Sequence, residues 1–72
     1  MSENKLFAVL LGGKIRKNNL MEDHKLVFVV AENEVDAAIS ARKKWDIKKS
    51  HIDGIQKLDN VDGYNIKLDK QA

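Results

Sequence analysis

Both histidines of this 72-residue chain lie close to an aspartate, and these residues have the clearest potential for chemistry. His24 directly follows Asp23, and His51 lies two residues before Asp53. Residues two apart in a β-strand point to the same face, so His51 and Asp53 would meet if their segment is a strand. A carboxylate beside an imidazole orients the ring. We therefore predict that His24, His51 and Asp53 belong to a ligand-binding site.

A glycine pair and a basic segment supply the other candidate ligand-binding residues. Gly12 and Gly13 end the apolar run AVLLGG, and Lys14 follows them directly in GGKIRKNN. Glycine lets the backbone approach a ligand closely, and a basic loop could close over a small anion. The stretch is not a phosphate loop, because the Gly-x-x-x-x-Gly-Lys-Ser/Thr spacing is missing. The alternative is that the two glycines only form a turn.

Two apolar segments and one helical pattern must position these residues. Residues 5–11 and 25–31 are apolar at almost every position, which predicts two β-strands. Asn33 is a suitable N-cap, and the acidic first turn and basic last turn that follow it predict a helix over Glu34–Trp45. The helical spacing i, i+3, i+4 and i+7 is also present, in Val35, Ala38, Ile39 and Arg42, with Ala37 and Ala41 beside them.

The last third of the chain contains two weaker strand patterns. Residues 51–58 have apolar residues that fit no single period, and Gly54 predicts a bulge that resets the alternation. Residues 64–68 alternate cleanly between apolar and polar side chains. Asp62 and Gly63 are typical of a two-residue hairpin turn. Such a turn would pair Asp59 with Ile66, and a longer loop is the alternative.

These elements predict a single α+β domain over residues 1–72, with a ββαββ order and an ordered core over about residues 5–69. We expect a four-stranded mixed sheet with the first strand inside it and the helix on one face. The second strand, the helix and the third strand form a crossover, so these two strands run in the same direction. That topology brings Gly12, Gly13, His24 and His51 to one end of the sheet.

The first two strands are apolar on both faces, although one helix covers only one face of a sheet. A bare apolar face is uncommon in a soluble monomer, so we expect a homodimer packed through it. The alternative is that residues 12–24 fold over this face. The dimer face would consist of one of two sets, Phe7, Val9, Leu11, Val27 and Val29, or the opposite set Leu6, Ala8, Leu10, Leu26, Phe28 and Val30.

Composition limits the remaining classes of function. The chain has no cysteine, which excludes disulfides and thiolate metal sites. Its net charge is +2. No apolar run approaches the length of a membrane span, and the N-terminus lacks a signal-peptide pattern, so we expect a cytoplasmic protein. We also expect no cofactor. Trp45 is expected in the core, with a role as an interface anchor as the alternative.

The leading hypothesis is a non-catalytic dimeric binding module with a small anionic ligand at the Gly-Gly/His end. One alternative is an enzyme that uses His51 as a general base oriented by Asp53, with or without a metal ion held by histidine and carboxylate. A second is an RNA-binding module that uses the basic cluster of residues 42–49. The alternative for this basic cluster is a solvated helix end, where its cations complement the helix dipole. They are Arg42, Lys43, Lys44, Lys48 and Lys49.

The stretches KLFAVLLGG, HKLVFVVAENEVDA, KKWDIKKSHIDGI and VDGYNIKL together resemble a small bacterial family, domain of unknown function 1543. The resemblance extends over about residues 5–68. It implies a small α/β domain that occurs in one or two copies per chain. It provides no catalytic role that could be assigned to residues of this chain. In that family the first histidine is often followed by an acidic residue, whereas Lys25 stands there in this chain. The family motifs coincide with Gly12, Gly13, His24, His51 and Asp53.

Overall fold

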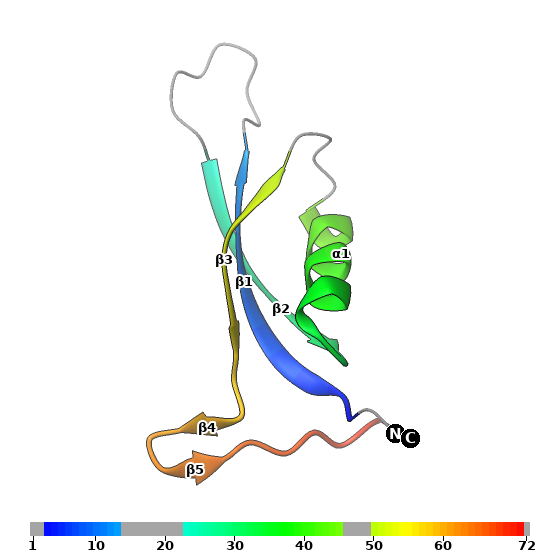
Figure 1. Cartoon of the computed structure of the whole chain (residues 1–72), viewed down its shortest axis with the longest axis vertical. Coiled ribbons are helices and arrows are strands. Elements are labelled where there is room, and N and C mark those ends of the chain that lie inside the picture. The colour runs from blue at the N-terminus through cyan, green and yellow to red at the C-terminus, as the bar shows by residue number, and fades with distance from the viewer. Residues whose placement is uncertain (1–2, 14–22, 46–49, 72) are drawn as a thin grey trace.

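The computed structural model describes residues 3–13, 23–45 and 50–71. Along the chain it contains β1 (Lys5–Gly13), β2 (Asp23–Ala31), α1 (Glu34–Trp45), β3 (His51–Lys57), β4 (Asn60–Val61) and β5 (Tyr64–Asn65) (Figure 1). Lys14 and the rest of its basic segment, as well as Lys48 and Lys49, lie outside the described residues.

The central sheet has the strand order β2-β1-β3, and β1 is antiparallel to both neighbours. The prediction of an interior first strand is confirmed, and β2 and β3 run in the same direction on either side of it. The prediction of a four-stranded mixed sheet is wrong, because the described residues form a three-stranded sheet and a separate β4–β5 hairpin. The central sheet ends where the amide of Leu58 donates to the carbonyl of Leu6 at 2.8 Å.

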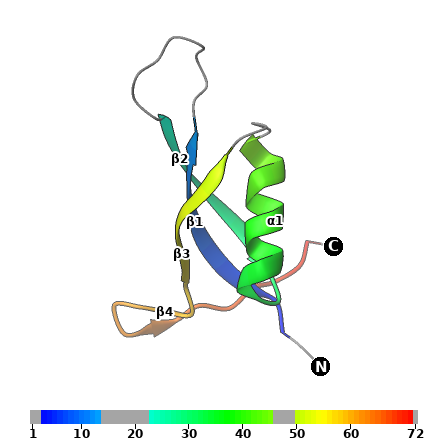
Figure 2. The same ribbon diagram turned by 45° about the horizontal axis from the view of Figure 1, so that its top comes forward.

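Helix α1 lies across one face of the sheet and has the predicted bounds (Figure 2). The amide of Asp36 donates to Oδ1 of Asn33 at 2.8 Å, and the amide of Ala37 donates to the Asn33 carbonyl at 3.0 Å, so Asn33 is the N-cap. The helix packs against the sheet through its small residues. Ala37 and Ala41 are fully buried, whereas Val35 and Ile39 are 70% and 49% exposed.

The core lies between α1 and the face of the sheet that it covers. Small alanines let the helix approach the sheet closely, and the large core side chains come from the strands. Trp45, Ile52 and Ile55 pack against this core, which supports the expected core position of Trp45. The first of the two candidate dimer faces is therefore buried under the helix, since its members are Phe7, Val9, Leu11, Val27 and Val29.

The opposite face of the sheet carries a row of exposed apolar side chains. Leu26 is 55% exposed, and Phe28 and Val30 are each 51% exposed. Leu10 lies opposite Leu26 in the register and is 37% exposed. We call this surface the open face. The loop that could cover it, residues 14–22, is outside the described part of the chain.

The β4–β5 hairpin has the two-residue turn that the sequence predicts. Asp62 and Gly63 have φ values of 54° and 85°, as a type I′ turn requires, and glycine adopts such values without steric cost. The amide of Ile66 donates to the Asp59 carbonyl at 3.0 Å, so the tight hairpin forms rather than the longer loop. Within the described residues, no helix is long and apolar enough to cross a membrane.

The N-cap provides a first test. Asn33→Ala removes the acceptor for the Asp36 amide and should lower the free energy of unfolding by about 1 kcal/mol in urea denaturation. Asn33→Ser keeps a side-chain oxygen as the acceptor in that place and should lose less stability than the alanine variant. Equal stability of the alanine variant and wild type would contradict the assigned cap.

Candidate functional site

Three strands bring the candidate residues together at one end of the central sheet. Gly12 of β1 pairs with His24 of β2 on one side and with His51 of β3 on the other. Paired residues in a sheet point to the same face, and Gly12 is two residues from Leu10, so all three lie on the open face. The predicted clustering of the glycines and histidines at one end is confirmed.

A β-bulge adds Asp53 to this group. Leu11 pairs with Ile52 and Leu10 pairs with Gly54, which leaves Asp53 as an extra residue in β3. The bulge predicted from Gly54 is thus present, one position earlier than the glycine. Bulges redirect side chains and often occur near functional sites. Here the bulge keeps Ile52 and Ile55 against the core while the Asp53 carboxylate reaches both histidines.

The Asp53 carboxylate bridges the two imidazole rings. Nε2 of His24 lies 2.8 Å from Oδ2, and Nε2 of His51 lies 2.9 Å from Oδ1. A carboxylate only accepts hydrogen bonds, so each Nε2 carries a proton and the neutral rings have their lone pairs on Nδ1. The histidine side chains are 49% and 45% exposed, and that of Asp53 is 28% exposed. We call these three residues the His-Asp-His cluster.

Gly12 provides the space for the carboxylate. A Cβ atom at this position would overlap Oδ2 of Asp53 and lie 2.8 Å from Nε2 of His51, closer than real Cβ contacts. The glycine was predicted to let backbone approach a ligand, and the group that approaches it in the structure is the carboxylate. Gly13 is buried and pairs with Asp23, whereas Lys14 is outside the described residues.

The cluster contains one contact that the sequence did not reveal. Asp53 was expected to orient His51, but its second oxygen is bonded to His24 from another strand. Lys25, which replaces the acidic residue frequent in the family pattern, pairs with Leu11 next to this end. His24 therefore has a carboxylate partner without an acidic neighbour at position 25. Only knowledge of the register and of the bulge could have predicted it.

The arrangement can hold and orient protons. With both rings neutral the cluster carries one negative charge, and each further proton adds one positive charge. A protonated ring has two N–H donors, so its Nε2–H can remain on Asp53 while its Nδ1–H donates elsewhere. Among the described residues, no three His, Asp or Glu side chains are arranged to hold a metal ion.

The basic cluster of residues 42–49 is only partly described. Arg42, Lys43 and Lys44 form the last turn of α1, where positive charge complements the helix dipole. Nζ of Lys44 donates to the backbone carbonyl of Phe28 at 2.5 Å, at the outer edge of β2. These contacts favour a structural role for the described part of the cluster.

Comparison with protein families places the chain beside a known family. The family model described as Domain of Unknown Function (DUF1543) matches residues 19–68. This range includes His24, His51 and Asp53, whereas β1 with Gly12 precedes it, so the match is shorter than the expected resemblance over about residues 5–68. No curated protein and no solved structure matches the chain.

Two glycines on the same face allow a matched test of the cluster. Gly12→Ala should displace Asp53 and lower the free energy of unfolding by about 1–3 kcal/mol, because the new methyl group is overpacked. Gly54→Ala should be nearly neutral, since its Cβ would meet only the Leu10 Cβ at 3.9 Å. Urea denaturation measures both variants. Equal effects would contradict the role of Gly12 as the space for the carboxylate.

Proposed function

The chain belongs to the Domain of Unknown Function (DUF1543) family, and we propose that it is a non-catalytic binding module. In this proposal the His-Asp-His cluster binds a small anion, and the open face joins two copies of the chain. The bridging carboxylate is the observation that carries the ligand site, because it holds two imidazole rings by the same nitrogen.

The anion would bind to the protonated cluster. Asp53 fixes each ring through Nε2, so a second proton turns Nδ1 into an N–H donor of fixed direction. Histidine gains this proton within the physiological pH range. When both rings are protonated, the cluster has a net positive charge despite Asp53. A small oxyanion, such as a sulfate, phosphate or carboxylate group, suits these donors because it accepts several hydrogen bonds.

Binding is favoured over catalysis by the surroundings of the cluster. The two rings are about half exposed, and the groove that the described residues form lies at the other end of the sheet. Ser50 is adjacent to His51, but consecutive residues in a strand point to opposite faces. Catalytic groups usually work in sites that exclude water. The described part of the chain offers the cluster neither a nucleophile nor such an enclosure.

Self-association is supported by the open face. Leu10, Leu26, Phe28 and Val30 are adjacent on β1 and β2, and each has more than a third of its surface exposed. A chain of 72 residues buries little apolar surface in its own core, and small domains commonly gain further stability from a partner chain. A second copy is the simplest partner, because a two-fold axis lets the same apolar surface cover itself.

Titration with sulfate tests the ligand site, because sulfate is a small oxyanion that accepts several hydrogen bonds. The ring signals of His24 and His51 in NMR spectra should shift on addition of sulfate. Chloride at equal ionic strength serves as the control. His24→Ala should weaken the binding, whereas Lys43→Ala, which removes an exposed cation on α1, should not. An equal response to chloride, or unchanged sulfate binding in His24→Ala, would contradict the proposal.

Sedimentation equilibrium tests the open face. Phe28→Asp places a charge in the middle of the apolar surface and should convert the dimer to a monomer, because an unpaired charge in an interface is costly. Val35→Asp makes the same change at an exposed apolar position on α1 and should leave the dimer intact. A monomeric wild type, or a dimer that persists in Phe28→Asp, would contradict the proposed interface.

A further inference from the structure

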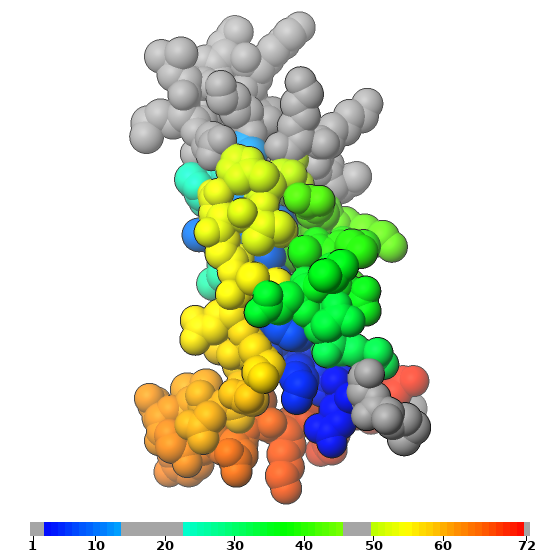
Figure 3. Space-filling view, in the orientation of Figure 1, coloured from blue at the N-terminus to red at the C-terminus, as the bar shows by residue number. Residues whose placement is uncertain are grey.

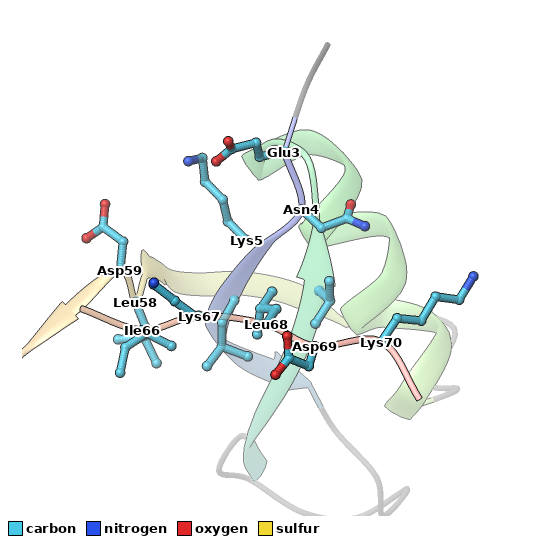
Figure 4. A pocket seen from close by; sticks show the side chains of 12 residues that line it. Glu3, Asn4, Lys5, Leu58, Asp59, Ile66, Lys67, Leu68, Asp69 and Lys70 are labelled. Carbon is cyan, nitrogen blue, oxygen red and sulfur yellow. The ribbon is translucent and has the colours of Figure 1, made fainter. Parts of the chain in front are cut away.

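A groove of about 870 Å³ lies at the end of the sheet away from the His-Asp-His cluster. The residues 66–70 run beside the open face here and form one wall of the groove (Figure 4). Its apolar lining continues the open face beyond Phe28, because Val30 belongs to both surfaces and Leu6 is paired with Val30. The apolar lining residues are Leu6, Val30, Leu58, Ile66 and Leu68.

The charges around this groove are balanced. The lining includes three acidic residues, Glu3, Asp59 and Asp69, and three basic residues, Lys5, Lys67 and Lys70. A nucleic acid or another strongly charged partner would favour a rim of one sign. A weakly charged occupant suits a balanced rim, and residues 60–65 of this chain carry a single charged side chain, Asp62. The rim therefore suits a second copy of this chain.

The β4–β5 hairpin is the segment best placed to enter such a groove. It projects from one end of the molecule, and we call it the arm (Figure 3). Within the described residues, it makes no close backbone contact with α1 or with the strands of the central sheet. Tyr64 is 75% exposed and Val61 is 42% exposed on this arm. An isolated two-stranded hairpin is only marginally stable in water, so the arm gains most from a partner surface.

We infer that the groove of each copy receives the β4–β5 arm of the other copy, with Tyr64 against the lining around Val30. This inference rests on the proposed self-association and adds the contact that completes it. A two-fold axis along the strands places both grooves at the same end of the dimer, and the exchange is then reciprocal. The tyrosine ring covers apolar lining, and its hydroxyl can remain at the charged rim.

The edge of β2 is a less suitable surface for the second copy. Edge pairing would need the outward backbone groups of β2 to bond to another strand. Lys44 of α1 donates to the Phe28 carbonyl in the middle of this strand, so a helix side chain competes with such pairing. Lysines at edge strands commonly protect against edge-to-edge association. The second copy is therefore expected on the face and in the groove.

The chain contains no cysteine, which permits a direct crosslinking test. Two variants, Val61→Cys and Val30→Cys, are each purified, mixed to exchange subunits, and oxidised. Val61 pairs with Tyr64 on the arm, so this variant keeps the tyrosine. Each chain then has a single thiol, so a disulfide between the two variants joins different copies. We expect this crosslinked pair in clear excess over the control, identified by mass spectrometry. A mixture of Lys43→Cys and Val30→Cys is the matched control and should give little crosslinked pair, because Lys43 is on the exposed side of α1.

The outcomes separate this inference from the proposed self-association. If wild type is dimeric but the Val61→Cys and Val30→Cys pair crosslinks no better than the control, the open-face dimer stands and the arm exchange is overturned. If wild type is monomeric, both are overturned. Tyr64→Ala provides a second measurement without oxidation. It should weaken dimerisation at least several-fold in sedimentation equilibrium, and an unchanged dimer would overturn the exchange.

Discussion

The pairing of β1 with two partners is the constraint on which the rest of the structure depends. Strands β2 and β3 both pair with β1 and do not pair with each other. Because β1 is central, its odd-numbered side chains form the middle of the core, and its even-numbered ones form the middle of the open face. The same strand carries Gly12 to the point where His24 and His51 flank it. Core, open face and His-Asp-His cluster are thus three consequences of one strand position.

The cluster and the open face are parts of a single surface. His24 lies two residues from Leu26 on β2, and Gly12 lies two residues from Leu10 on β1, so polar and apolar groups follow each other along the same strands. In the proposed function, the polar end stays accessible while a second copy covers the apolar part. At the opposite end of the sheet, the apolar part continues into the groove, whose rim carries equal numbers of acidic and basic residues. In that proposal the sheet separates a ligand-binding end from an assembly end.

Local patterns in the sequence predicted the helix and the two long strands, because capping residues and apolar runs act over a few neighbours. They also predicted that the histidines gather at one end, since topology follows from element order. The apolar period of the helix does not show which of its side chains are buried, and in the structure Ala37 and Ala41 are buried against the sheet while Val35 and Ile39 are exposed. The contact between His24 and Asp53 depends on the bulge in β3, and the separate hairpin depends on long-range pairing, which no local pattern contains.

The strand order also determines how far apart in the sequence the paired strands are. Pairing of β1 with β2 closes a shorter loop than pairing of β1 with β3, and closing the shorter loop costs less entropy. The contact between His24 and Asp53 joins β2 to β3, the two strands that meet only through β1. It can therefore form only when the whole sheet is assembled. The ring signals of His24 would report the completion of the sheet, and a chain that has formed only the first hairpin would lack the His-Asp-His cluster.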